Sequence, residues 1–186
     1  MKAIVFFLEE PSAREMLNGL LPCMLPSDIH VRYLIFQGKQ DLEKNLARRL
    51  RGWLNPDSKF VVMRDQDAGD CRQVKRKLAT LCNDAGKEGV LIRIACHELE
   101  SFYLGDLAAV ERGLGPRRLS SKQNNAKYRN PDRLANPSEK LKKLTVGGYQ
   151  KISGSRAIGK HLSVERNFST SFNMLVSGIQ KLVNAF

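Results

Sequence analysis

Four continuous apolar runs, each followed by a segment of helical pattern, most restrict the folds open to this chain of 186 residues. The runs are AIVFFLE from Ala3, VRYLIFQ from Val31, KFVVMRD from Lys59 and VLIRIAC from Val90. An uninterrupted apolar run is typical of a strand that is covered on both faces, as strands of parallel sheets are. We therefore predict an α/β fold with a mainly parallel sheet of about four strands, flanked by helices and joined by right-handed crossovers.

Between the runs, apolar residues recur with the period of amphipathic helices. One stripe consists of Leu42, Leu46, Leu50 and Trp53, and the next consists of Val74, Leu78, Leu81, Cys82 and Ala85. A further helix is expected from about Glu98, after the fourth run. The predicted order is therefore strand and helix in alternation, and ligands of such sheets gather at the carboxyl ends of the strands.

Two of the predicted helices have a polar residue at their start, followed three positions later by Glu or Gln. Ser12 is followed by Glu15, just after Pro11, and Asp70 is followed by Gln73. Both pairs fit a capping box, in which the first side chain accepts a hydrogen bond from a backbone amide of the first helical turn. We predict helix starts at both positions.

Positive charge is concentrated in the last part of the chain. The formal net charge is +12, and residues 1–110 contain 16 Lys and Arg against 15 Asp and Glu, whereas residues 111–186 contain 15 against 4. The first part is thus nearly neutral and the second strongly basic. Because neutralised phosphates release counterions, such a segment favours a polyanionic partner. The alternative is a basic surface that only keeps the protein soluble.

The composition of the chain changes after residue 112, which suggests two regions within a single domain. Residues 1–112 form the predicted α/β core, and residues 113–186 form a basic loop and helical extension packed on it. Residues 113–136 are predicted to be a long surface loop or a mobile arm. The motif SEKLKKL predicts a short helix, GGYQKISGSRAIGKHLS a glycine-rich basic connection, and residues 172–183 the buried stripe of a terminal helix.

The composition also bears on where the protein resides. With 42% hydrophobic and 27% charged residues, the chain is typical of globular proteins, and no apolar run approaches the ~20 residues of a membrane span. Met1 leads directly into a predicted strand, without a small-residue cleavage site. The four cysteines form no C-x-x-C pair and are expected to be free thiols. We predict a cytoplasmic protein with no membrane partner.

Acidic residues directly follow three of the four apolar runs. They are Glu9 and Glu10 after the first run, Asp65 and Asp67 after the third, and Glu98 and Glu100 after the fourth. Because the carboxyl ends of parallel strands meet at one edge of the sheet, these side chains are expected to converge there. Residues two apart in an extended chain point to the same side, so Asp65 and Asp67 would offer oxygens to one hard cation.

Neighbouring carboxylates stay ionised only beside a metal, an arginine or solvent. Arg64 would point to the opposite face if the strand continues, so the pattern favours a metal. We expect Mg²⁺ or Mn²⁺ to bind through Asp65 and Asp67, with Glu100 and Glu98 as additional ligands. These two glutamates would also be tolerated by the dipole of a first helical turn, which is a structural explanation for them.

Several short motifs together resemble a known family. FFLEEPSAREML, VVMRDQDAGD, HELESFYLGD, YQKISG and RNFSTSFNML are similar, in this order, to the bacterial family known as domain of unknown function 4276. A glutamate after the first strand and a D-x-D after a later one also resemble the Toprim fold of topoisomerases, primases and OLD-type nucleases. The resemblance implies that Glu9 is the general acid or base and that Asp65 and Asp67 hold magnesium. Glu10 departs from the pattern, because many Toprim domains have glycine there.

The same resemblance implies a setting, since small Toprim-like proteins often accompany ATPases in phage-defence systems. The chain contains no G-x-x-x-x-G-K-[ST] motif, so nucleotide hydrolysis would belong to a partner chain.

The leading hypothesis is a magnesium-dependent nuclease or nuclease-like module that acts on DNA or RNA phosphodiesters. The side chains expected to hold the nucleic-acid backbone are Arg117, Arg118, Lys122, Lys127, Arg129 and Lys151. Tyr128 would either stack on a base or be a half-buried loop aromatic.

Two other functions remain open from the sequence. A non-catalytic nucleic-acid-binding or regulatory subunit would retain the fold and the basic surface. A receiver-like phosphoacceptor would share the acidic pair after the first strand and an aspartate after the third, but the extra acid of the D-x-D and the basic extension fit it poorly. Metal-dependent cleavage distinguishes the nuclease from the subunit, and labelling by a small phosphodonor identifies the receiver.

Overall fold

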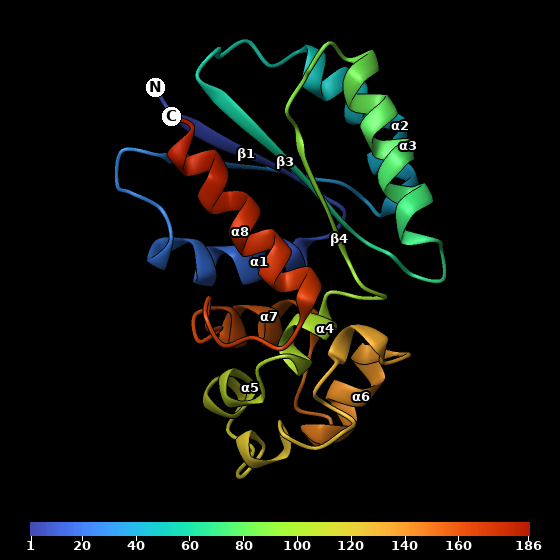
Figure 1. Cartoon of the computed structure of the whole chain (residues 1–186), viewed down its shortest axis with the longest axis vertical. Helices are drawn as coiled ribbons and strands as arrows, with labels where there is room; N and C mark the ends of the chain where they lie inside the picture. Colours follow the sequence, from blue (N-terminus) through green and yellow to red (C-terminus); the bar gives the residue numbers. More distant parts are fainter.

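The computed structural model describes all 186 residues and is built on a four-stranded parallel sheet (Figure 1). The strands are β1 (Ala3–Leu8), β2 (His30–Ile35), β3 (Ser58–Asp65) and β4 (Leu91–Ala95), in the order β2-β1-β3-β4. Every residue of the central strand β1 is buried, as its continuous apolar sequence predicts. The predicted parallel α/β sheet is thus confirmed.

Helices cover both faces of the sheet. On one face, α2 (Lys39–Arg51) and α3 (Cys71–Asp84) pack against Val5, Phe7 and Val62. On the other, α1 (Pro11–Leu20) and the terminal helix α8 (Thr170–Asn184) pack against the alternate residues of β1. Adjacent residues of one strand therefore enter two different cores, which explains why these strands lack a polar face.

A group of short elements lies beyond the carboxyl ends of the strands. It consists of α4 (Glu100–Leu104), α5 (Leu107–Leu114), the 3₁₀ turns η2 (Ser120–Lys122) and η3 (Pro131–Arg133), α6 (Pro137–Leu144) and α7 (Lys151–Gly159). Figure 1 shows these elements below the sheet, with α7 beside α1. Their buried residues join the core of the α1 face, so one hydrophobic cluster runs from the sheet into the carboxy-terminal region.

The segment 113–136 is an irregular surface loop that is fixed by its own packing. Leu119 and Tyr128 are buried, and the Gln123 side chain accepts a hydrogen bond from the Leu107 amide (2.7 Å) while donating to the carbonyls of Leu104 and Tyr128. These interactions hold the middle of the segment against α4 and α5. The segment therefore has the form of the surface loop that was predicted as one of the two alternatives.

The glycine-rich stretch 147–163 contains a helix, α7, where a connection was predicted. Its glycines permit close packing: a Cβ at Gly159 would lie 2.6 Å from the carbonyl oxygen of Met16 in α1, and a Cβ at Gly154 would lie 2.5 Å from the Tyr149 ring. The glycines in this stretch are needed because neighbouring atoms lie too close for a side chain. Glycines usually indicate a loop, so the helix was not predicted from the sequence.

One of the two predicted capping boxes is present. The Asp70 carboxylate accepts a hydrogen bond from the Gln73 amide (2.8 Å) at the start of α3. At the start of α1, in contrast, Ser12 donates its hydroxyl to Glu10, and Glu15 pairs with arginines. The Ser12–Glu15 prediction was wrong because tertiary partners compete for both side chains. None of the helices has the length and apolar character needed to cross a bilayer.

Candidate active site

Glu9 and Asp65 lie next to each other at the carboxyl edge of the two central strands. Glu9 follows β1, and its backbone amide donates to the carbonyl of Met63 in β3 (3.3 Å). The backbone amide of Asp65, the last residue of β3, donates in turn to Glu9 Oε2 (3.1 Å). The parallel pairing of β1 with β3 thus fixes the Glu9 carboxylate over the end of β3.

The side chain of Asp65 is buried without a compensating partner. The residue is 8% exposed, and its carboxyl group makes no hydrogen bond or ion pair. Burial raises the pKa of Asp65 well above its usual range, and the charges of Glu10, Glu100 and Glu9 raise it further, with Lys151 opposing them. A buried carboxyl group of this kind is a candidate functional group because its charge is not stabilised by the fold alone.

Glu100, the first residue of α4, adds a second unsatisfied oxygen. Its Oε1 accepts a hydrogen bond from the Tyr149 hydroxyl (2.8 Å), but Oε2 is buried and has no partner. Burial raises the pKa of Glu100, which the Tyr149 hydrogen bond and the charge of Lys151 partly offset. Buried polar atoms are almost always paired, so a buried carboxylate oxygen without a protein partner is a candidate ligand for a cation.

A lysine from a distant segment faces these acids. Lys151, the first residue of α7, donates its ammonium to Glu10 Oε2 (3.0 Å), and the Ser12 hydroxyl donates to Glu10 Oε1 (2.5 Å). Burial alone would lower the pKa of Lys151, but the charges of Glu10, Glu100 and Asp65 raise it. Lys151 was predicted as a contact to the nucleic-acid backbone, and the structure places it inside the acidic cluster.

Asp67 is directed away from Asp65. Strand β3 ends at Asp65, and Asp67 has a left-handed backbone with φ of 55°. Its Oδ2 binds the Lys39 ammonium (2.8 Å) and lies 3.7 Å from the Arg64 guanidinium. The prediction that both aspartates point to the same side assumed an extended chain, and the turn after Asp65 contradicts that assumption.

Arg64 neutralises much of the negative charge of the carboxylates at the end of β3. Its side chain is 4% exposed and pairs with Glu43 of α2 (2.7 Å), with Glu9 (3.8 Å) and with Asp67. Arg64 does point to the α2 face, as the strand periodicity predicts. Its side chain is nevertheless long enough to reach Glu9 and Asp67 at the end of the strand. The sequence interpretation therefore missed its role, although an arginine within a buried apolar run is a visible signal.

Glu98 has a structural role that explains its position. Its Oε2 accepts a hydrogen bond from the Ser138 amide in the first turn of α6 (2.8 Å). Glu98 also lines a hollow of about 430 Å³ with Asp67 and His97, and both of these residues have positive φ. The structure does not bring Glu98 to the Asp65 cluster in any direct contact.

The donor set of the cluster suits a hard cation, although its arrangement is incomplete. All candidate donors are carboxylate oxygens, which Mg²⁺ and Mn²⁺ prefer. Asp65 is 8% exposed and its carboxyl group has no partner, Glu100 Oε2 is buried without one, and Glu9 and Glu10 lie beside them. No three Asp, Glu, His or Cys side chains meet in a geometry ready to hold an ion. The residues fit a cation by their chemistry, and small side-chain movements would have to complete its ligand set.

The other predicted basic residues lie on the loop between α5 and α6. They are Arg117, Arg118, Lys122, Lys127 and Arg129, and all five are exposed. Figure 1 places this loop at the bottom of the molecule, beyond α5 and α7 from the sheet. Tyr128 is buried at 6% exposure, under the Lys127 ammonium, so its predicted stacking on a base is contradicted.

Comparisons with known proteins identify the family. The model of the family described as domain of unknown function (DUF4276) matches residues 8–180, and the chain belongs to this family, as its motifs predict. Among solved structures, the C-terminal region of the Burkholderia pseudomallei OLD protein is similar with a TM-score of 0.53 and 16% identity. The similarity covers 97% of this chain and 98% of that one, which confirms a Toprim-like fold. A comparison with curated proteins gave no match.

Proposed function

We propose that this DUF4276 member is a metal-dependent phosphodiesterase of nuclease type that acts on DNA or RNA. The observation that carries the proposal is the buried carboxyl group of Asp65, which has no partner, together with the buried, unpaired Oε2 of Glu100, beside Glu9 at the carboxyl edge of the sheet. A fold gains nothing from such groups unless they bind something. The basic extension supplies the polyanion affinity that a nucleic-acid substrate requires.

The ion that we propose is Mg²⁺ or Mn²⁺, held by Asp65 with Glu100 and Glu10 as neighbouring donors. Asp67 would join this set only after releasing Lys39. When bound, the cation offsets negative charge on the phosphoryl oxygens of the substrate.

Glu9 is proposed to transfer the proton. Burial raises the pKa of Glu9, and this brings it closer to neutral pH, where a general acid or base is most effective. The Asp65 amide and the Arg64 guanidinium oppose this shift and also fix the carboxylate in position. Glu9 is therefore oriented by backbone and side-chain contacts that do not depend on substrate.

Lys151 is proposed to bind a phosphoryl oxygen at the edge of the cluster. Its side chain is 46% exposed, so one side of the ammonium faces Glu10 while the other is open to a ligand. A substrate phosphate that displaced Glu10 from Lys151 would leave Glu10 available for the cation.

The test is cleavage of mixed single- and double-stranded DNA and RNA by the purified protein with Mg²⁺, with Mn²⁺ and with EDTA. We expect metal-dependent cleavage that Glu9→Gln and Asp65→Asn abolish. Glu88→Gln and Asp28→Asn, exposed positions near the opposite ends of the strands, are the matched controls and should cleave like wild type. Cleavage by Glu9→Gln at the wild-type rate would exclude Glu9 as the acid or base.

A non-catalytic regulatory subunit is the second candidate, because one observation favours it. Arg64 and Lys39 already pair with Asp67, so one of the two aspartates predicted to hold the metal is neutralised without a metal. In either case we propose that an ATPase, as a separate chain of a phage-defence system, is the partner. Wild-type protein that binds nucleic acid but does not cleave it with either metal, alone or with a co-expressed ATPase, would support the subunit.

A further inference from the structure

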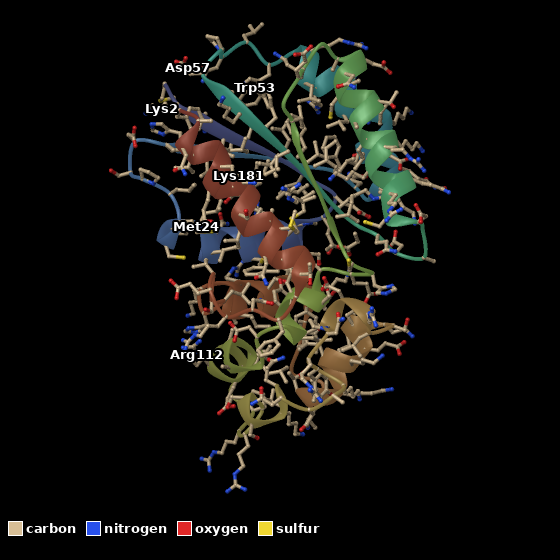
Figure 2. All side chains as sticks on the ribbon, viewed as in Figure 1. Lys2, Met24, Trp53, Asp57, Arg112 and Lys181 are labelled. Atoms are coloured by element: carbon tan, nitrogen blue, oxygen red, sulfur yellow. The ribbon has the colours of Figure 1, made fainter.

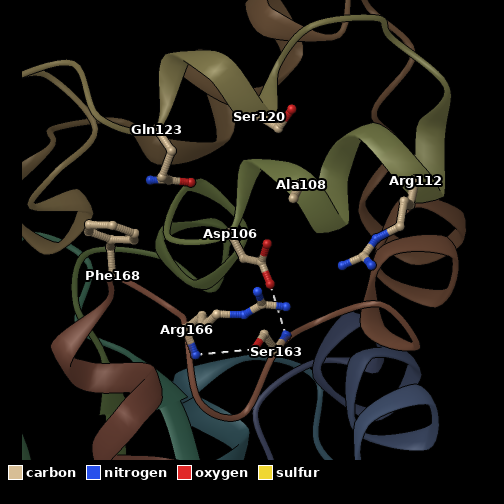
Figure 3. A pocket seen from close by; sticks show the side chains of 8 residues that line it. All are labelled: Asp106, Ala108, Arg112, Ser120, Gln123, Ser163, Arg166 and Phe168. Atoms are coloured by element: carbon tan, nitrogen blue, oxygen red, sulfur yellow. Dashed lines mark hydrogen bonds between the residues drawn. The ribbon is translucent and has the colours of Figure 1, made fainter.

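A second hollow lies between α5 and the segment that joins α7 to α8, and none of its lining residues belongs to the acidic cluster at the strand ends (Figure 3). Its volume is about 240 Å³, and it is lined by Arg112 and Ser120 on one side and by Ser163, Arg166 and Phe168 on the other. The hollow is smaller than the roughly 300–1,000 Å³ of pockets that enclose drug-sized ligands. Its size therefore fits one unit of a longer polymer better than a whole small molecule.

The polar groups on the floor of the hollow are already satisfied. Asp106 accepts hydrogen bonds from the Ala109 amide (3.0 Å) and the Ser163 amide (2.8 Å). The Asp106 side chain thus caps the start of α5. The Gln123 side chain is fully used in holding the loop. These residues give the hollow a fixed shape but leave no free donor of their own.

The arginines, in contrast, have unused donors. Arg166 makes no side-chain hydrogen bond or ion pair, and Arg112 makes one, to the His161 carbonyl (3.1 Å). Figure 3 shows both guanidinium groups beside the hollow, and Figure 2 places Arg112 in the lower part of the molecule. A guanidinium group has five N–H donors and binds phosphate in a fork geometry.

The local charge is positive although Asp106 is present. Burial and the charges of Lys160 and Arg112 together lower the pKa of His161, beside the hollow, and Asp106 only partly opposes them. Ser120 also belongs to η2, in which Lys122 is exposed, and the preceding Arg117 and Arg118 are exposed as well. The hollow therefore continues the basic surface of this loop.

Phe168 adds an aromatic surface to this basic site. Its side chain is 42% exposed, although it precedes the buried Ser169 cap of α8 and its backbone is fixed by a hydrogen bond to the Gly105 carbonyl. Exposed aromatic rings beside cationic grooves are the common means of binding bases without sequence preference. Two guanidinium groups and one exposed aromatic ring thus line the same small hollow.

We propose that this hollow binds one nucleoside unit of a single-stranded nucleic acid, with the two phosphates that flank it on Arg112 and Arg166 and its base against Phe168. The inference rests on the proposed function only in taking nucleic acid as the ligand, and it does not involve the metal or Glu9. The hollow would hold the strand outside the cleavage site.

The test is binding of fluorescently labelled single-stranded DNA and RNA oligonucleotides, measured by anisotropy in EDTA so that no cleavage occurs. For Arg166→Ala we expect weaker binding and a salt slope lower by ~0.7, the value of one phosphate contact on a single strand. For Phe168→Leu we expect a loss on the order of tenfold, because leucine keeps apolar volume but lacks a ring. Phe168→Tyr should restore binding.

Arg32→Ala is the matched control, because Arg32 is an exposed arginine on the edge strand β2 without a side-chain partner. Wild-type affinity in both Arg166→Ala and Phe168→Leu, an equal loss in Arg32→Ala, or no binding by wild type would each overturn the proposal. The proposal would also be overturned if the hollow bound AMP while Arg166→Ala and Phe168→Leu still bound oligonucleotides with wild-type affinity, because the hollow would then bind free nucleotides and not a strand. Arg166→Ala and Phe168→Leu should bind oligonucleotides weakly but still cleave them at high substrate concentration. Glu9→Gln should bind oligonucleotides normally but not cleave them. These opposite results distinguish the hollow from the strand-end site.

Discussion

Lys151 and Glu10 are 141 positions apart in the sequence, yet their side chains form an ion pair of 3.0 Å at the strand ends. The contact exists because α7 packs closely on α1, where Glu10 is the N-cap residue. Gly19 of α1 faces the backbone of Lys160, and Gly159 faces the backbone of Met16. The packing of α7 on α1 therefore positions the Lys151 ammonium in the candidate active site.

This packing predicts that Gly159→Ala destabilises the protein. The added Cβ would meet the backbone of Met16 at 2.6–3.1 Å, which no side-chain rotation can relieve, so α7 has to move. We expect a loss of about 1–3 kcal/mol in the free energy of unfolding, measured by urea denaturation. Ser153→Ala, on the exposed side of the same helix, is the control, and equal stability of both variants would contradict the prediction.

Lys151→Met is expected to destabilise the protein more at pH 8 than at pH 5. The charge of Lys151 lowers the pKa values of Asp65 and Glu100, and its effect matters only when those carboxyl groups are ionised. The pKa of Lys151 is itself raised, so the lysine is charged at both pH values, and the predicted difference comes only from the ionisation of Asp65 and Glu100. Thermal melts at the two pH values measure the difference, and Lys142→Met is a control on α6.

The pKa of Asp65 predicts that Asp65→Asn stabilises the metal-free protein. The folded state keeps its proton at pH values where the unfolded carboxyl group has lost it, so folding stability falls as pH rises above the usual pKa of aspartate. The amide has no such penalty. We expect a rise of roughly 2–4 °C in Tm at pH 7.5, the change that ~1 kcal/mol produces in a chain of this size.

Asp67→Asn is the contrasting variant, since it loses contacts to Lys39 and Arg64 and should not gain stability. Excess Mg²⁺ or Mn²⁺ should raise the Tm of wild type and of Asp67→Asn, but not that of Asp65→Asn. The same increase in all three proteins would show that the cation binds elsewhere.

Glu15→Gln is expected to weaken the contact between α1 and α7. Hydrogen bonds from Arg156 (2.6 Å) and Arg14 (2.7 Å) lower the pKa of the nearly buried Glu15, so this carboxylate stabilises the fold above its usual pKa and loses that effect as pH falls. Because Arg156 is largely exposed, we expect a cost of only about 1 kcal/mol at pH 7. Urea denaturation at pH 7 and pH 3 should show the difference between wild type and variant shrinking in acid.

The sequence by itself determined the sheet and the edge at which the acids gather. Continuous apolar runs identify strands buried on both faces, and parallel connection places Glu9 and Asp65 at the same edge, where the structure joins them by a hydrogen bond of 3.1 Å. Both conclusions depend on the local period of the chain and on the rule that parallel strands share a direction. The start of α3 after Asp70 could also be predicted, because the cap involves only residues three positions apart.

Only the tertiary structure decided which acids act together. Asp67 leaves the cluster because one residue with positive φ ends the extended chain, and Arg64 and Lys39 then bind it. Tyr149 and Lys151 enter the cluster because glycines let α7 approach α1. Such contacts depend on the relative placement of elements that are far apart in sequence, and side-chain periodicity carries no information about that placement.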